Sequence, residues 1–106
     1  MIFITGPLYS GKRTFAQKLP GQCLADVQEL AAGANDLTAL ADRLAGQYDI
    51  LIATEVGGGV VPVDAGQRAA REAAGRLACL LAARADCVVQ MFCGIPTVLK
   101  GELPEC

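Results

Sequence analysis

The chain contains no histidine, and aromatic residues make up only 5% of its 106 residues. With so few aromatic rings, the hydrophobic core must be aliphatic and rich in alanine. No C-x-x-C pair joins the odd set of cysteines, which are Cys23, Cys79, Cys87, Cys93 and Cys106. Because no histidine can complete a metal site with these scattered thiols, we expect free thiols in a reducing cytosol.

Excess charge and long hydrophobic runs are also missing. The net charge of −2 provides no basic field, so nucleic acid is not an expected partner. No segment approaches the ~20 apolar residues of a membrane span, and the N-terminus lacks the charged region of a secretory signal. We therefore expect residues 1–106 to form one cytoplasmic domain that does not contact a membrane.

The residues that are present point first to phosphate binding. An apolar strand at residues 2–4 leads into GPLYSGK at residues 6–12, which fits the phosphate-loop pattern G-x-x-x-x-G-K. Glycines let successive backbone N–H groups surround a phosphate, and Lys12 adds a positive charge at the start of a helix expected over Arg13 to Leu19. The residues predicted to bind nucleotide are Gly6, Pro7, Leu8, Tyr9, Ser10, Gly11, Lys12, Arg13 and Thr14.

The residue after Lys12 departs from the pattern. A Ser or Thr hydroxyl normally follows the lysine and holds Mg²⁺, but here Arg13 takes that place and Thr14 comes next. Thr14 cannot replace the hydroxyl because one helical step turns a side chain by about 100°. It faces either the α-phosphate or the helix carbonyls, while Arg13 either pairs with phosphate oxygens or points to solvent. No metal ligand is assigned, and the Mg²⁺ site is in question.

Beyond the loop, strands and helices alternate. A short strand is predicted at residues 22–25, a helix start at 26–29, and a helix through Gln47 capped by Asn35 or Asp36. A buried strand follows at 48–54, then a long helix from an Asp64 cap to Arg84 or Ala85. Its predicted apolar stripe is Ala69, Ala73, Leu77, Leu80 and Leu81. Gly75 within this helix suggests close backbone packing, and residues 87–93 and 97–100 predict a strand, a turn and a strand.

This alternation predicts an α/β fold, a P-loop NTPase-like three-layer sandwich with a mainly parallel sheet and a C-terminal strand-turn-strand. Ligands of such sheets bind at the carboxyl ends of strands, where the phosphate loop lies and where Glu55 follows the strand at 48–54. Glu55 is therefore a candidate catalytic residue that holds a metal-bound water or orients an attacking hydroxyl. The alternative is a loop carboxylate that pairs with an arginine of the next helix.

Two blocks carry a family resemblance. One is the glycine-rich loop ending in Ser10-Gly11-Lys12, and the other is the run from Ile50 to Gly101 with TEVGGGVVP at residues 54–62. The sequence resembles the adenosylcobinamide kinase/adenosylcobinamide-phosphate guanylyltransferases of cobalamin biosynthesis. Arg68, Gly75-Arg76-Leu77, Ala85-Asp86 and Gly94-Ile95-Pro96 fall where that family has its helix arginines, its Gly-Arg pair, an Ala-Asp pair and its final turn. The resemblance implies ATP or GTP as nucleotide, a corrinoid substrate and a symmetric oligomer such as a trimer.

Differences from the family restrict the activity that the resemblance implies. Residues 21–47 replace a larger middle region, which in the family carries the histidine that becomes guanylylated, and this chain has no histidine. Ala78 and Cys79 replace an Asn-Gln pair. The chain is therefore predicted to be a shortened adenosylcobinamide kinase-like phosphotransferase that has lost guanylyl transfer. Lys12 would cradle the phosphates and Glu55 would assist the hydroxyl.

Two further alternatives stay open. The chain is either such a kinase or a non-catalytic nucleotide-binding paralogue or assembly subunit; an unrelated small P-loop kinase is a third reading. Arg68, Arg71 and Arg76 either offset charge in the transition state or form a solvated helix face, with Glu72 and Arg76 as an i,i+4 pair.

Overall fold

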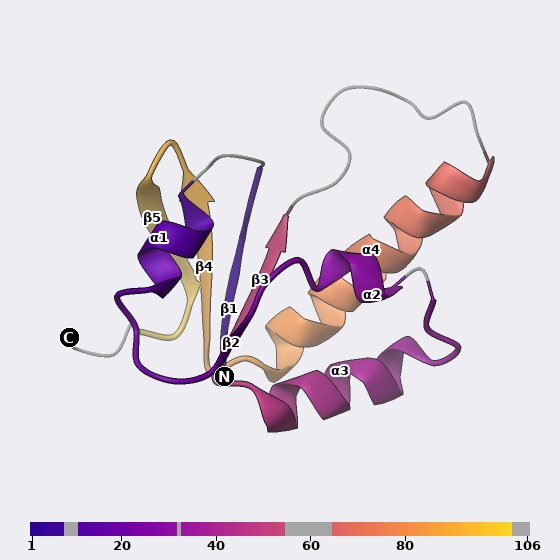
Figure 1. The fold of residues 1–106 in the computed structure, drawn as a ribbon, viewed down its shortest axis with the longest axis horizontal. Coiled ribbons are helices and arrows are strands. Elements are labelled where there is room, and N and C mark those ends of the chain that lie inside the picture. The colour runs from indigo at the N-terminus through magenta and orange to yellow at the C-terminus, as the bar shows by residue number, and fades with distance from the viewer. Residues whose placement is uncertain (8–10, 32, 55–64, 103–106) are drawn as a thin grey trace.

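The computed structural model describes residues 1–7, 11–31, 33–54 and 65–102, the side chains of 65–67 excepted. Its elements follow the chain as β1 (Ile2–Gly6), α1 (Lys12–Ala16), β2 (Cys23–Leu24), α2 (Gln28–Ala31), α3 (Leu37–Gln47), β3 (Ile50–Thr54), α4 (Ala65–Arg84), β4 (Cys87–Phe92) and β5 (Ile95–Lys100). Figure 1 shows α1 on one side of the sheet and α2, α3 and α4 on the other. The predicted three-layer α/β fold is confirmed.

The described strands form a five-stranded sheet in the order β2-β3-β1-β4-β5. β1 lies at its centre and pairs in parallel with β3 on one side and β4 on the other. β5 runs antiparallel to β4 at the edge, with a register shift near Val88. The sheet is thus mainly parallel, and the predicted strand-turn-strand closes it at the C-terminal end.

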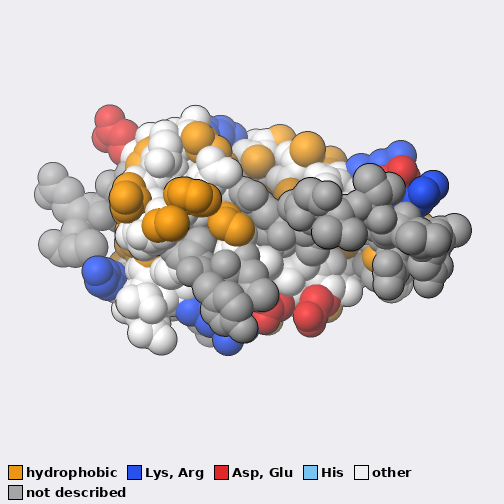
Figure 2. Space-filling view, turned by 90° about the horizontal axis from the view of Figure 1, so that it is seen from above, with side chains coloured by type: hydrophobic (Ala, Val, Ile, Leu, Met, Phe, Trp, Pro, Cys, Tyr) orange, Lys and Arg blue, Asp and Glu red, His pale blue; other side chains and the backbone are white. Residues whose placement is uncertain are grey.

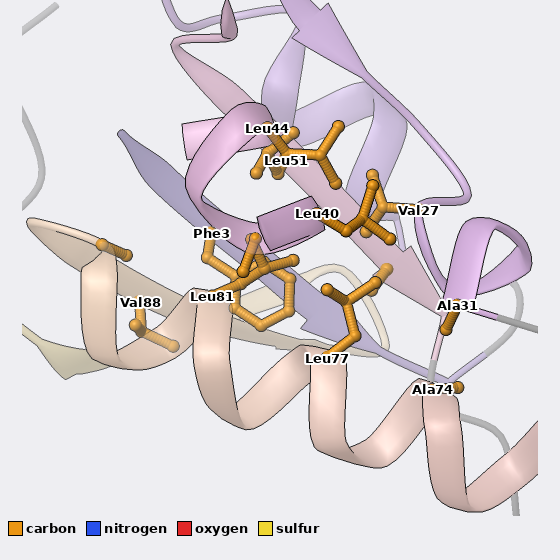
Figure 3. Close-up of a cluster of buried hydrophobic side chains, with 13 residues drawn as sticks. Phe3, Val27, Ala31, Leu40, Leu44, Leu51, Ala74, Leu77, Leu81 and Val88 are labelled. Carbon is orange, nitrogen blue, oxygen red and sulfur yellow. The ribbon is translucent and has the colours of Figure 1, made fainter. Parts of the chain in front are cut away.

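Side chains alternate between the two faces of the sheet, and each face buries its own cluster. On the α1 side, Ile4, Ile52, Val89 and Met91 pack with Ala16 and Leu19. On the other side, Phe3 of β1 lies next to Leu77 and Leu81 of α4, as Figure 3 shows. Burial of one such large apolar side chain contributes about 1.5–3 kcal/mol, so these two clusters hold the layers together.

Local signals explain the helices on that second side. The Asp36 carboxylate accepts hydrogen bonds from the backbone N–H groups of Thr38 and Ala39, which makes it the N-cap of α3. Leu40, Ala41 and Leu44 share the buried face of α3. An ion pair of 2.5 Å between Arg84 and Asp42 joins α4 to α3. The predicted helix through Gln47 is therefore confirmed, and of its two predicted caps, Asn35 or Asp36, the structure shows Asp36.

Several details of the helices were predicted wrongly. α1 ends at Ala16 rather than Leu19. In α4, Ala74 is buried whereas Ala69 is exposed, because the helix turns its face toward α2 and α3. A Cβ atom added at Gly75 would meet nothing within 4 Å, so the predicted close packing there is absent in the described part of the chain.

The remaining predictions for α4 concern its charges and its start. Among the ion pairs of the described residues, none joins Glu72 to Arg76. The predicted Asp64 cap lies outside the described residues. None of the described helices combines the length and apolarity that a bilayer crossing requires.

Candidate functional site

The strand before the predicted phosphate loop and the strand before Glu55 end side by side in the sheet. Gly6 at the end of β1 is the register partner of Thr54 at the end of β3. From β1 the chain continues through α1 on one face toward β2, and from β3 it continues through α4 on the other face toward β4 (Figure 1). The ends of β1 and β3 thus form a topological switch point, where ligands of parallel sheets bind.

Lys12 lies inside the loop rather than in solvent. It is the first residue of α1, only 6% of its surface is exposed, and its Nζ donates a hydrogen bond of 2.7 Å to the carbonyl oxygen of Pro7. The side chain therefore turns back toward Pro7, just beyond the end of β1. A buried cation needs polar partners, and an incoming phosphate would supply stronger ones than a carbonyl oxygen.

Gly11 gives the loop its sharp entry into α1. Its φ of 89° is left-handed, and a Cβ atom added there would lie 3.2 Å from the Cα of Gly94. The turn of the β4–β5 hairpin therefore lies against the loop at this point. Glycine is favoured here, because another residue would meet both an unfavourable backbone conformation and a close neighbouring backbone.

Arg13 pairs with a residue that sequence reasoning did not single out. Its guanidinium lies 2.5 Å from the Asp26 carboxylate and its side chain is 68% exposed. Asp26 has a positive φ of 57° between β2 and α2. The pair is exposed and contributes at most about 1 kcal/mol. Arg13 is thus held toward α2, and its predicted contact with phosphate oxygens stays a prediction.

Among the described residues, the two positions after Lys12 offer no ligand for Mg²⁺. A guanidinium cannot ligate a cation, and the Thr14 side chain one step further is exposed. Within the described ranges, no group of three or more Asp, Glu, Cys or His residues could hold a metal ion.

A groove of about 500 Å³ lies beside α1, between this helix and β2. It is lined by Arg13, Ala16, Gln17, Leu19, Gly21, Cys23, Ala25 and Ile52. Burial raises the pKa of the Cys23 thiol, while the positive charge of Arg13 acts in the opposite direction. No residue pattern in the sequence predicted this groove.

Gln28 is a second residue that the sequence did not mark. Its Oε1 accepts a hydrogen bond of 3.0 Å from the backbone N–H of Thr54. In addition, the N–H of Val27 donates to the carbonyl of Ile52. These bonds tie the end of β3 to the start of α2, so the point where the chain leaves β3 toward Glu55 is fixed from the side.

Some predicted site residues cannot be placed. Leu8, Tyr9, Ser10 and Glu55 lie outside the described residues, and so does most of TEVGGGVVP. Of the helix arginines, Arg68 and Arg76 are exposed and Arg71 is half-buried. Their predicted roles stay predictions.

A comparison with protein families gives a match over most of the chain. Residues 22–99 match the family model described as cobinamide kinase / cobinamide phosphate guanyltransferase. The matched range contains β2 through most of β5 and excludes the loop at residues 6–14. A search of curated proteins found no match. The resemblance seen in the second block of the sequence is therefore confirmed, whereas the phosphate loop at residues 6–14 stays a prediction from its own residues.

Proposed function

Since this chain belongs to the cobinamide kinase / cobinamide phosphate guanyltransferase family, we propose that it binds ATP or GTP at residues 6–14 and acts as a phosphotransferase. The acceptor is a hydroxyl of adenosylcobinamide or a related corrinoid in cobalamin biosynthesis. The whole domain, residues 1–106, would serve this one nucleotide site. A homo-oligomer such as a trimer belongs to the same proposal.

The observation that carries this proposal is the position of Lys12. Its buried ammonium lies at the carboxyl end of the central strand, within a glycine-bounded loop and beside the switch point of the sheet. A solvated surface lysine would be exposed and would not turn back onto Pro7. Positioning and charge stabilisation are most of what phosphoryl transfer requires of a protein, and Lys12 with the loop N–H groups supplies both.

Glu55 has the second role in this proposal. It follows Thr54, whose register partner is Gly6, so the carboxylate would enter from the strand end next to the phosphate loop. There it would orient the attacking hydroxyl or a metal-bound water. Guanylyl transfer is not included, because the histidine that the family resemblance requires is missing from all 106 residues.

A nucleotide-binding protein without catalysis is the second candidate. Arg13 favours it, because this residue replaces the hydroxyl that would hold Mg²⁺ and is paired with Asp26. Without a hydroxyl ligand for the metal at position 13, charge on the transferring phosphoryl group is less well neutralised. Binding would then survive where turnover does not.

Calorimetric titration with ATP and GTP, with and without Mg²⁺, is the first step in distinguishing the phosphotransferase from the non-catalytic nucleotide-binding protein. We expect binding by the wild type and a loss of at least tenfold in Lys12→Met, which keeps the buried aliphatic stem and removes the charge. Lys18→Ala is the matched control, because it removes the same charge from an exposed position just after α1. Equal affinities of wild type and Lys12→Met would contradict the proposed loop.

Turnover is then measured with adenosylcobinamide and ATP or GTP, following the phosphorylated corrinoid by chromatography. Product that forms with Mg²⁺ and disappears in Lys12→Met supports the phosphotransferase. Nucleotide binding that depends on Lys12 without product supports the non-catalytic binder.

A further inference from the structure

The large apolar side chains that stay exposed gather on the β4–β5 hairpin. Among the described residues they are Leu30, Phe92, Ile95, Val98 and Leu99, and all except Leu30 belong to this hairpin. Phe92 and Ile95 are cross-strand partners on either side of its turn, and each is 65% exposed. We call Phe92, Ile95, Val98 and Leu99 the hairpin patch. Figure 2 shows hydrophobic side chains grouped at this end of the molecule.

The hairpin patch surrounds the outer edge of the sheet, where β5 is the last of the described strands. Met91 packs in the cluster on the α1 side, so alternation along the strand places Phe92, with Ile95 opposite it, on the α4 side. Val98 is the register partner of Val89, which belongs to the cluster on the α1 side. A partner at this edge therefore touches side chains from both faces of the hairpin.

The helix on the Phe92 side covers only the base of the hairpin. Lys100, at the end of β5 away from the turn, donates hydrogen bonds to the carbonyl oxygens of Ala82 and Ala83 near the end of α4. From there α4 runs away from the hairpin toward its own first residue (Figure 1). Packing within the described part of the chain therefore does not explain the exposed pair Phe92 and Ile95.

We propose that the hairpin patch is the surface that binds a second copy of this chain, with each copy contributing the same patch. The inference rests on the homo-oligomer included in the proposed function, and it names the residues that hold the copies together. Such a contact is two-fold symmetric, because the same residues meet from both sides.

The area of the hairpin patch fits this occupant. With large apolar side chains of about 150–200 Å² each, the exposed fractions of the four residues amount to roughly 400 Å². A stable interface of standard size takes about 800 Å² from each partner, and somewhat more than half of that is apolar. The hairpin patch therefore supplies most of the apolar area that one copy has to contribute.

The charge of the hairpin patch also suits a copy of itself. No Asp, Glu, Lys or Arg occurs from residue 87 to residue 99. A charge near a two-fold axis meets its own copy, and like charges across an interface weaken binding. An extended peptide added to the edge of β5 is a poorer occupant, because Pro96 lacks an N–H group and the register shift near Val88 makes the edge irregular.

The experiment measures the molar mass of the wild type, Ile95→Lys and the control Leu30→Lys by light scattering after size exclusion, at a series of micromolar concentrations. Leu30→Lys makes the same change at an apolar residue that is 43% exposed on α2, away from the hairpin. Lysine is well tolerated on edge strands, but at a two-fold contact it places two like charges together. We expect a dimer for the wild type and for Leu30→Lys, and association at least about tenfold weaker for Ile95→Lys.

Circular dichroism shows whether each variant is folded. Phe92→Ser is the second variant, because it removes apolar area from the hairpin patch without adding a charge. It should also weaken association, and it decides the question if Ile95→Lys does not fold.

Calorimetric titration of the same proteins with ATP and GTP keeps this inference apart from the proposed function. A monomeric wild type overturns the hairpin patch as a contact between copies, and the proposed nucleotide site stands if nucleotide still binds. A trimeric wild type overturns the two-fold contact. Association that survives in folded Ile95→Lys, or that is lost equally in Leu30→Lys, also overturns it. If a dimeric wild type binds neither nucleotide and Ile95→Lys is monomeric, the hairpin patch is supported and the proposed nucleotide site fails.

Discussion

Replacement of Gly11 by alanine tests the backbone of the phosphate loop directly. The φ of 89° at this residue costs an L-amino acid about 1–2 kcal/mol. The new Cβ atom would also lie 3.2 Å from the Gly94 Cα, so the hairpin turn or the loop must shift. We expect Gly11→Ala to lose about 2 kcal/mol of unfolding free energy, which in a domain of this size lowers the Tm by roughly 10 °C.

Gly75→Ala is the matched control for this substitution. A Cβ atom at Gly75 meets nothing within 4 Å, and the residue lies within α4. Alanine there should raise stability by about 0.5–1 kcal/mol, because glycine is the poorer helix former. The assay is urea unfolding followed by circular dichroism, together with tripolyphosphate titration of both variants.

The two variants should therefore move in opposite directions. If Gly11→Ala unfolds like the wild type, the left-handed turn against the hairpin is not a requirement of the fold. If Gly75→Ala instead has a lower free energy of unfolding than the wild type, another molecule, such as a second copy of the chain, covers that face of α4 in solution.

Three further predictions follow from the described core, termini and thiols. Leu81 is fully buried, so Leu81→Ala should lower the free energy of unfolding, measured with urea, by about 3–5 kcal/mol. This loss should be more than twice that of Leu80→Ala, because Leu80 is half-buried. Equal losses would contradict the described packing. A hydrogen bond from the Met1 ammonium and its charge hold the pKa of Asp86 below its ordinary value. The ionised carboxylate then stabilises the fold above about pH 4, and this contribution is lost as the pH falls through the lowered pKa. The Tm of the wild type should accordingly fall more steeply below pH 4 than that of Asp86→Asn, and parallel curves would refute the pair. Burial raises the pKa of the Cys87 thiol whereas Cys79 and Cys93 are exposed, so peptide mapping after iodoacetamide at neutral pH should find Cys79 and Cys93 modified and Cys87 only after denaturation.

Much of the fold was predictable because its signals are local. Short continuous apolar runs marked β1, β3 and β4, and the Asp36 cap and the spacing of Leu40 and Leu44 marked α3. The order of strands and helices also implied the parallel sheet. The errors lie where neighbours from elsewhere decide: Ala74 replaces Ala69 in the core because α2 and α3 determine which side of α4 is covered.

The candidate site divides in the same way. The sequence by itself determined the glycine-bounded loop with Lys12 and the absence of a guanylylatable histidine, since these depend on residue type and spacing along the chain. Only the tertiary structure decided that Lys12 is buried against Pro7, that Arg13 pairs with Asp26 and that the hairpin turn lies against Gly11. Lys12 and Pro7 are only five residues apart, but the other two contacts join separate elements that approach each other only in the assembled sheet. The order of the strands is set by the packing of the whole sheet rather than by any one stretch of residues.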